Sequence, residues 1–392
     1  MIRTVRFSNF YSFNKEQVID FTSSKKEGYS YYNSKNGDQI TKVATFIGGN
    51  ASGKTNVMRL LSFLSYFVTR SSVNPSEENS LSSSYKTFFN NSRPSMFEIE
   101  FELDDGIFVY HLELKDGIVL NESLRMKEIK KGARPTYVFK RNGDITLYNG
   151  YFRGIENSFL DNIRKDISLI AYIKAHYSIE IIDTVFNYFL SFHTNLNELG
   201  VTNNPFQQIH TLEKYLADDE IKEKMEEVIA NFDIGLSGFE IKKKKLAEDK
   251  FQIMVHGIHN TKEKNKLLNF VYESRGTQSL FFLIGSLLSG IKNNTVIILD
   301  ELETGLHPEA VSKLISYFLD ENENSKAQLI LTSHSFTFLN TLDMHQIYLT
   351  KKDENSMTSC KRLNEIEGAR CDENFVRKYM AGKYGSFPNI MI

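Results

Sequence analysis

The segment "GGNASGKTN" (Gly48–Asn56) brings together glycines, a lysine and a threonine at a spacing that could bind a polyphosphate. Gly48 is followed by four residues and then by Gly53, Lys54 and Thr55, which is the complete spacing of a phosphate-binding loop. Glycines let backbone N–H groups turn toward phosphate oxygens, and a helix that begins here adds the partial positive charge of its N-terminus. In this interpretation Lys54 reaches the β- and γ-phosphates of ATP, and the Thr55 hydroxyl holds Mg²⁺. The predicted nucleotide-binding residues are Gly48, Gly49, Asn50, Ala51, Ser52, Gly53, Lys54, Thr55 and Asn56.

The segments on either side of this loop favour a phosphate site over a glycine turn that binds no ligand. Lys42–Ile47 is a short, mostly apolar stretch with β-branched residues, which predicts a buried strand. Thr55–Val68 is rich in apolar residues and predicts a helix. Strand, glycine loop and helix are the context in which this motif binds phosphate.

A second chemical signal is the pair of acids in "TVIILDELETGLHP" (Thr295–Pro308), where an apolar strand ends at Asp300 and Glu301. An acid that ends a strand beside the phosphate-binding strand can hold Mg²⁺, so we predict Asp300 as a metal ligand together with Thr55. Glu301 could polarise the attacking water as a general base. The alternative is two solvated acids at the end of an ordinary strand.

A histidine follows the next predicted strand. "QLILTSHS" (Gln328–Ser335) is an apolar run that ends in Thr-Ser-His, and His334 comes one strand after the acidic pair. We expect His334 to contact the γ-phosphate or the attacking water, although a lone histidine after a strand is often structural. The predicted catalytic residues are therefore Glu301 and His334.

The composition is that of a globular protein large enough for one large domain or two to three ordinary ones. The chain has 392 residues, of which 41% are apolar and 24% charged, and its net charge of −2 does not by itself favour binding to polyanions. Cys360 and Cys371 lack the spacing of a metal site or a disulfide framework. No run reaches the length of a membrane span and the first residues do not resemble a signal peptide, so we expect a cytoplasmic protein without a membrane partner.

The elements that must position these residues follow from the hydrophobic pattern. Residues 2–13 predict a strand and a turn, 96–148 a run of β-hairpins, 157–231 helices, and 238–258 a further hairpin. The last third alternates helices (277–291, 309–320 and 336–342) with strands (295–299, 328–332 and 346–350). The sequence therefore predicts an α/β fold with a mixed β lobe, a mainly parallel sheet and a helical insertion.

Four further stretches are polar or basic. Residues 23–41 and 69–86 predict surface loops, and disorder is the alternative for the second. Lys127–Arg141 and Lys242–Lys245 could contact nucleic-acid phosphates without reading sequence. The alternative is that these lysines keep the edges of β-hairpins from pairing with other strands.

The motifs together resemble the ATP-binding-cassette (ABC) ATPases, within them the recombination and repair branch of SMC proteins, RecF and the ATPase part of OLD-family nucleases. "FSNFYSF" (Phe7–Phe13) is similar to the opening motif of that branch, and "ETGLHP" (Glu303–Pro308) to its turn after the acidic pair. "YESRGTQSLFFL" (Tyr272–Leu283) stands where the branch carries its signature sequence. "YMAGKYGSFP" (Tyr379–Pro388) resembles the tail of stand-alone bacterial ATPases with an OLD-type core, several of which belong to anti-phage systems beside a separate toxin or nuclease.

The resemblance implies the fold of an ABC-ATPase head and a head-to-tail homodimer or higher homo-oligomer. Ser274, Gly276 and Thr277 would form the signature and contact ATP bound to the opposite subunit. Two residues depart from the family pattern, because Tyr11 replaces a basic residue and Arg275 replaces a glycine or serine. No glutamine is assigned to the family's Q-loop, since Gln207 and Gln208 lie in the predicted helical region.

The sequence thus predicts three parts: residues 1–156 as an N-terminal ATPase lobe, 157–235 as a helical insertion, and 236–392 as a C-terminal ATPase lobe. The helical part could be a lid or a docking surface for a partner protein. Two functions stay open at this point. The first is a sensor or regulator ATPase that controls a separate effector, a nuclease or toxin, in bacterial anti-phage defence. The second is a RecF- or SMC-like clamp that binds DNA non-specifically during repair.

Overall fold

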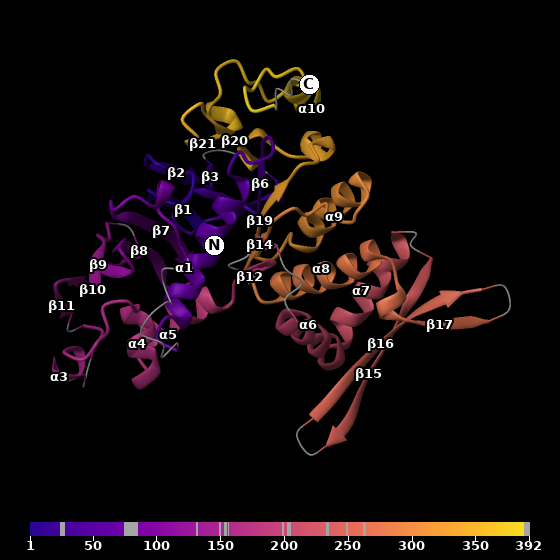
Figure 1. Cartoon of the computed structure of the whole chain (residues 1–392), viewed down its shortest axis with the longest axis horizontal. Helices are drawn as coiled ribbons and strands as arrows, with labels where there is room; N and C mark the ends of the chain where they lie inside the picture. Colours follow the sequence, from indigo (N-terminus) through magenta and orange to yellow (C-terminus); the bar gives the residue numbers. More distant parts are fainter. Residues whose placement is uncertain are drawn as a thin grey trace.

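Two large β-sheets, three small ones and the helices between and beside the large sheets build the described part of the molecule (Figure 1). The computed structural model describes residues 1–392 except 24–27, 74–84, 131, 149, 153–154, 156, 198–199, 202–204, 233–234, 248–249, 262–263 and 388–392. In this described part, no helix is both long enough and apolar enough to cross a lipid bilayer.

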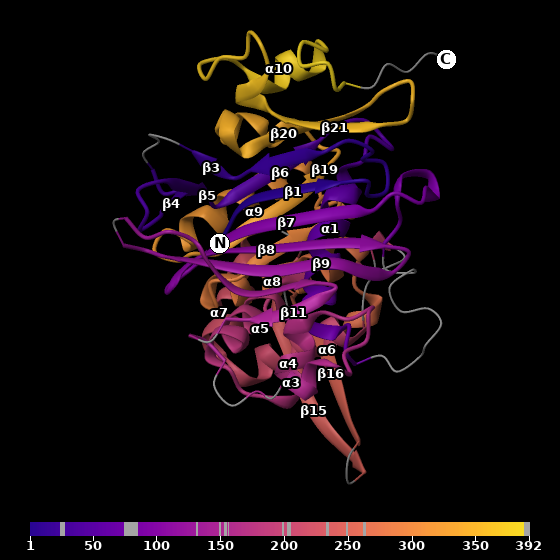
Figure 2. The ribbon, with the colours of Figure 1, turned by 90° about the vertical axis from the view of Figure 1, so that its left-hand side faces the viewer.

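The first sheet is antiparallel and has seven strands in the order β11-β10-β9-β8-β7-β1-β2. It faces the viewer in Figure 2. Its strands are β1 (Ile2–Ser8), β2 (Gln17–Asp20), β7 (Ser95–Leu103), β8 (Gly106–Lys115), β9 (Ile118–Glu128), β10 (Thr136–Asn142) and β11 (Asp144–Leu147). The β pattern predicted over residues 96–148 is confirmed, because alternate side chains such as Phe97, Ile99 and Phe101 are fully buried.

The second sheet has six strands in the order β12-β18-β19-β6-β20-β21, and every pair except β20–β21 is parallel. Its strands are β6 (Val43–Ile47), β12 (His193–Thr194), β18 (Val296–Leu299), β19 (Gln328–Ser333), β20 (Ile347–Lys352) and β21 (Thr358–Arg362). The acid-bearing strand β18 was expected beside the phosphate strand β6, and this is wrong. β19 pairs with both and lies between them, because Leu329 and Leu331 share register positions with strands on either side.

The parallel sheet is buried on both faces. Ala44 and Phe46 of β6 point into the core that contains α1, whereas Val43 and Ile47 point into the core formed by the C-terminal helices. A strand covered on both sides is apolar at nearly every position, which explains the mostly apolar run before the phosphate loop, in which Thr45 is the polar residue.

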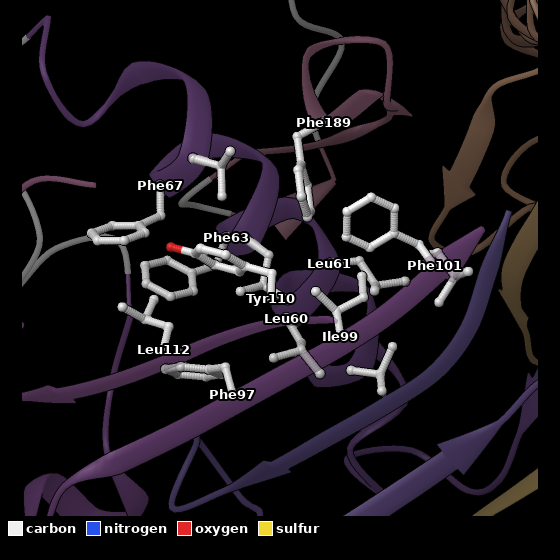
Figure 3. Close-up of a cluster of buried hydrophobic side chains, with 14 of the residues drawn as sticks. Leu60, Leu61, Phe63, Phe67, Phe97, Ile99, Phe101, Tyr110, Leu112 and Phe189 are labelled. Atoms are coloured by element: carbon white, nitrogen blue, oxygen red, sulfur yellow. The ribbon is translucent and has the colours of Figure 1, made fainter. Parts of the chain in front are cut away.

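Helix α1 (Lys54–Arg70) packs between the two sheets. Figure 3 shows Leu60, Phe63 and Phe67 of α1 against Phe97 and Tyr110 of the antiparallel sheet. The ring centroids of Phe63 and Phe97 are 5.3 Å apart. Aromatic pairs at this distance add to the stability gained from burial, so this core fixes the axis of the helix that carries the phosphate loop.

The remaining helices divide between the two cores. α4 (Leu169–His176) and α5 (Glu180–Leu190) pack on α1, whereas α6 (Pro205–Ala217) and α7 (Asp219–Asn231) pack on α8 (Arg275–Lys292). α3 (Asn157–Leu160) precedes them and α9 (Pro308–Glu321) follows α8. The residues predicted as a single helical insertion therefore belong to both cores, and the predicted limits of the three parts stay a prediction.

Several short elements differ from the prediction. Part of the loop expected over 23–41 forms a small sheet of β3 (Thr22–Ser23), β5 (Gln39–Thr41) and β4 (Tyr31–Asn33), which its buried residue Ile40 anchors. The helix expected over 336–342 is a 3₁₀ segment, η3 (Thr337–Thr341), where Thr341 Oγ1 bonds to the carbonyl of Phe338 over 2.7 Å and competes with helical bonding. Most of the loop predicted over 69–86 lies outside the described residues.

The other short elements are β13 (Leu196–Asn197), β14 (Gly200–Val201), η1 (Phe88–Asn90), η2 (Phe270–Tyr272), η4 (Met344–Gln346), η5 (Leu363–Glu365) and α10 (Phe375–Met380). The predicted hairpin over 238–258 is present as β15 (Leu236–Ala247) and β16 (Lys250–Asn260), and β17 (Asn265–Asn269) extends it to three strands. This hairpin projects from the body of the molecule (Figure 1).

Lys42, just before β6, forms hydrogen bonds to the residues that follow α9. Its side chain is buried at 2% exposure, and Nζ donates hydrogen bonds to the carbonyl oxygens of Asn322, over 2.5 Å, and Glu323, over 2.8 Å. A lysine at a helix C-terminus satisfies carbonyls that have no partner within the helix. Burial lowers the pKa of Lys42 to about 8, and the Glu323 carboxylate opposes this shift.

We expect Lys42 to make the free energy of unfolding rise with pH above about 8. The folded protein releases the Lys42 proton near pH 8, whereas the unfolded chain holds it up to about its ordinary pKa of 10.5. The unfolded state therefore binds more protons in this window, and stability rises with pH wherever that is so. The urea midpoint of the wild type minus that of Lys42→Met, measured across the window, should increase as pH rises. Parallel pH profiles would contradict the assignment.

Candidate active site

A pocket of about 420 Å³ opens where β6, β18 and β19 end. Its lining in the described part of the chain is Asn50, Ala51, Ser52, Gly53, Lys54, Thr55, Asn56, Glu301, His334 and Lys352. Three motifs that are far apart in the sequence thus face one cavity. The carboxyl ends of neighbouring parallel strands meet at one edge of a sheet, which is why they converge.

Two of the three glycines of the phosphate loop occupy places where a side chain would not fit. A Cβ on Gly48 would lie 2.4 Å from the carbonyl oxygen of Thr350 and 2.6 Å from Ser52 Oγ. Gly53 has φ of 101°, in the left-handed region, and a Cβ there would lie 2.5 Å from Thr358 Oγ1. The loop therefore rests on threonines of β20 and β21, and only glycine permits this close approach.

Lys54 bends back over the loop. Its Nζ donates hydrogen bonds to the carbonyl oxygens of Gly48, over 2.8 Å, and Gly49, over 3.0 Å. Burial lowers the pKa of Lys54, while the carboxylates of Asp300, Glu303 and Glu301 oppose this shift. A partly desolvated ammonium group held at the floor of a pocket is suited to an anionic ligand.

The acidic pair is held by Thr332 of β19. Asp300 is 1% exposed, and its Oδ1 accepts a hydrogen bond from Thr332 Oγ1 over 2.5 Å. The backbone N–H of Glu301 donates to the same hydroxyl oxygen over 2.9 Å. Glu301 has φ of 50°, a left-handed conformation that costs a non-glycine residue about 1–2 kcal/mol. This bend turns the Glu301 side chain toward the pocket, where it is half-exposed.

His334 lies between Lys54 and Glu301. Its Nδ1 is 3.4 Å from Lys54 Nζ, and its Nε2 is 3.9 Å from Glu301 Oε1. Its backbone N–H donates to Glu303 Oε1 over 2.5 Å, which ties the end of β19 to the turn after the acidic pair. The structure therefore brings Lys54, Glu301 and His334 together as the sequence predicted, and their catalytic roles stay a prediction.

Asn195 is a site residue that the sequence did not reveal. It directly follows β12, and its side chain donates to the carbonyl oxygen of Asp300 and accepts from the Asp300 N–H, both over 2.8 Å. The sequence gives no sign of this residue, because β12, the strand before it, has only two residues and produces no periodic pattern. Both glutamines considered for the Q-loop are in α6, and Gln208 lines a neighbouring groove of about 700 Å³, which Asn195 and Glu301 also line.

The predicted signature residues stand at the start of α8 and are not among the described residues that line the pocket. Ser274 caps the helix, because its Oγ accepts from the Thr277 N–H over 3.1 Å and bonds to Thr277 Oγ1 over 2.9 Å. A Cβ on Gly276 would lie 2.5 Å from the carbonyl oxygen of Gly305. Close packing within the chain is therefore one reason for this glycine, apart from any ligand.

The opening motif supports the phosphate loop from the other side. Ser12 Oγ accepts hydrogen bonds from Asn56 Nδ2, over 2.8 Å, and from Thr358 Oγ1, over 2.7 Å. Tyr11, which replaces a basic residue of the family pattern, lies under the guanidinium of Arg59 at 5.0 Å from the ring centroid. A cation from α1 therefore stands beside the position where the opening motif lacks one.

The residues around the pocket fit the phosphates of a nucleotide with a divalent cation. The cradle that a Cβ would fill, the buried Lys54 ammonium and the Thr55 hydroxyl supply the donors and the oxygen ligand that such a group requires. Asp300 supplies a carboxylate whose Oδ1 is already oriented.

A protein-family model described as "AAA domain, putative AbiEii toxin, Type IV TA system" matches residues 43–340, which includes every predicted site residue. The chain belongs to this AAA-domain family. The members of this family are P-loop ATPases. The matched residues include the phosphate loop and the acidic pair described above. A search of curated proteins finds no match to the chain.

Solved structures show the same fold in SMC heads. An SMC head bound to the C-terminal winged-helix domain of ScpA is 15% identical, with a TM-score of 0.51, and the match covers 92% of this chain and 96% of that one. This likeness confirms the predicted α/β fold of an ABC-ATPase head. Two other heads match less closely over 92% of this chain. They are the SMC head domain from Thermotoga maritima (14% identity, 98% of its chain, TM-score 0.42) and a Smc head derived from Pyrococcus furiosus, bound to the C-terminal domain of ScpA (13%, 95%, 0.46).

We predict that Gly48→Ala weakens ATP binding about tenfold or more while the fold is kept. The added methyl group meets the Thr350 carbonyl, which cannot rotate away, so the loop must shift off its phosphate-binding geometry. Calorimetric titration with ATP measures the loss. Gly150→Ala is the matched control, because a Cβ there meets nothing within 4 Å. Equal ATP affinity in Gly48→Ala and the control would contradict the prediction.

Proposed function

We propose that this chain hydrolyses ATP to ADP and phosphate. The observation that carries the proposal is that Lys54, Glu301 and His334 line one pocket above a phosphate loop. In this proposal residues 48–56 hold the phosphates, and Lys54 exchanges its carbonyl partners for phosphate oxygens. Glu301 accepts the proton of the attacking water, and His334 holds the γ-phosphate or that water in place.

Mg²⁺ would be held by the Thr55 hydroxyl and the Asp300 carboxylate, and when bound it neutralises charge on the phosphates. Asn195 forms hydrogen bonds to the main chain of Asp300, and Thr332 donates one to its Oδ1. The main chain and Oδ1 of Asp300 are therefore held in place before any ion binds. Such preorganisation lowers the cost of reaching the transition state.

We further propose that two copies assemble head to tail, with ATP between the phosphate loop of one and Ser274, Gly276 and Thr277 of the other. Two observations support this. The signature residues stand apart from their own chain's pocket lining, and the helix N-terminus that they form is suited to an anion. ATP would close such a dimer and hydrolysis would open it.

The biological role that we propose is regulation of a separate effector, a toxin or nuclease, in anti-phage defence. The matching family is named for a putative toxin of a type IV toxin–antitoxin system, which supports a place in such a system. The similar SMC head with a TM-score of 0.51 is bound to the C-terminal winged-helix domain of ScpA, which supports a protein partner for a head of this fold.

A second candidate is a clamp that binds DNA through the β15–β16 hairpin. Lys242–Lys245 are exposed on its projecting arm (Figure 1). Lys242 pairs with Glu240 and Lys243 with Glu213, whereas the other two lysines form no ion pair with the described residues. β15 is also an edge strand, where lysines prevent unwanted pairing. The other basic stretch, 127–141, is less favourable, because Arg141 is buried beside Glu122.

We expect Glu301→Gln to bind ATP but to lose at least about a hundredfold in turnover, because an amide keeps the shape and cannot accept a proton. The variant should accumulate as the ATP-closed dimer, seen by light scattering when ATP is added. Glu309→Gln, an exposed acid in the first turn of α9, is the matched control and should behave as the wild type. Wild-type turnover in Glu301→Gln would place the base elsewhere.

Mixing two inactive variants tests the composite site. Lys54→Ala damages the phosphate loop and Ser274→Arg the signature, and each homodimer carries its defect in both sites. In a mixed dimer one site receives both defects and the other receives neither, so ATPase activity should reappear on mixing. Ser274→Ala controls for the lost helix cap, which costs about 1 kcal/mol. Full activity of the Ser274→Arg homodimer would show that hydrolysis needs one chain only.

A further inference from the structure

Thr332 makes hydrogen bonds to three consecutive residues of the acidic turn. Its hydroxyl donates to Asp300 Oδ1 over 2.5 Å and accepts from the Glu301 N–H over 2.9 Å, and its carbonyl oxygen accepts from the Leu302 N–H over 3.2 Å. The residue is fully buried, and it lies in β19, between the acid-bearing strand and the phosphate strand. No neighbouring residue in β19 could reach the turn in the same way, because alternate side chains point to the opposite face.

The direction of these bonds is set by chemistry. Asp300 as a carboxylate only accepts, and the Glu301 N–H only donates. A hydroxyl can satisfy both at once, since it carries one proton and two lone pairs. Within the described part of the chain Asp300 Oδ2 accepts no hydrogen bond, so the contact with Oδ1 leaves Oδ2 as the free oxygen of this acid.

The same hydroxyl stabilises the strained backbone of Glu301. The left-handed φ of 50° is unfavourable for a residue with a side chain, and it persists only where the surroundings fix it. The bond from the Glu301 N–H to Thr332 Oγ1 is such a constraint. This conformation directs the Glu301 carboxylate into the pocket, 3.9 Å from His334 Nε2.

We propose that Thr332 is a positioning residue for ATP hydrolysis, whose one hydroxyl orients both acids of the site. It holds Oδ1 of Asp300, which would leave Oδ2 to bind the proposed metal ion, and it holds Glu301 in the backbone conformation that directs its carboxylate into the pocket, where it would meet the attacking water. This inference rests on the proposed ATPase activity. It adds that the metal ligand and the base are coupled through a single side chain of the neighbouring strand.

The test compares Thr332→Val, which keeps the shape and loses the hydroxyl, with Thr332→Ser, which keeps the hydroxyl. We expect Thr332→Val to lower kcat about tenfold or more and to raise the Mg²⁺ concentration for half-maximal activity, with little change in KM for ATP. Thr332→Ser should stay within about twofold of the wild type, by the same reasoning. If Thr332 had only a structural role, Thr332→Val would lower stability. It would not lower kcat and raise the Mg²⁺ requirement while leaving KM for ATP unchanged.

Thr45→Val is the matched control. Thr45 lies in the neighbouring strand β6, is equally buried, and its hydroxyl has no hydrogen-bond partner among the described residues. The same substitution there should leave kcat and the Mg²⁺ requirement unchanged. If Thr332→Val does not fold, Thr332→Cys replaces it, because a thiol fills the space and is a poor donor.

The outcomes separate the two proposals. A wild-type protein that does not hydrolyse ATP would refute the proposed function. A wild type that hydrolyses ATP, together with a folded Thr332→Val or Thr332→Cys of unchanged kcat and Mg²⁺ requirement, would overturn only the role of Thr332. A loss of activity in Thr332→Ser as large as in Thr332→Val would overturn it as well, because the hydroxyl would then not be what matters.

Discussion

The parallel pairing of β6, β19 and β18 is the constraint on which the candidate site depends. Three neighbouring strands that run in the same direction end at one edge, and the segment after each strand carries a residue with different chemistry. These residues are Lys54 after β6 and its loop, His334 after β19 and Glu301 after β18. Burial on both faces fixes the register of these strands, since a shift by one residue would move each side chain into the opposite core, where it would not fit its neighbours. The positions of the three side chains therefore depend on the packing of these strands in the two hydrophobic cores, away from the pocket itself.

Much of this arrangement could be predicted because the motifs carry their own chemistry. The spacing from Gly48 to Thr55 specifies a loop that bends toward phosphate, and the apolar runs before Asp300 and His334 specify strands of a buried parallel sheet. The order of those strands was not predictable from the runs themselves. A parallel strand can pair on either side, and β19 lies between β6 and β18 because of contacts along the whole strand, which leave no pattern in one sequence.

The residues that the sequence did not reveal hold other residues in place and do not themselves carry the predicted chemistry. Asn195 holds the main chain of Asp300 and follows a strand of two residues, too short to produce a periodic signal. Thr332 looks like an ordinary β-branched residue of a strand, and its role depends on which strand lies next to it. Likewise Gly276 is explained by its contact with Gly305, which the sequence places nearly thirty residues away. Such residues become visible only when the tertiary structure sets their partners.

The contacts of Thr350 and Thr358 with the phosphate loop affect when this loop can form during translation of the chain. Thr350 and Thr358 belong to β20 and β21, so the floor of a loop encoded near the start of the chain is supplied close to its end. β6 is also flanked by β19 and β20, both from the last quarter of the chain. While the ribosome is still translating, the nascent loop has neither its neighbouring strands nor its support, and chains emerge at only about 5–20 residues per second. We therefore expect a growing chain to be unable to bind nucleotide until β20 and β21 have left the ribosomal tunnel, so that a copy made only up to that point does not compete for ATP.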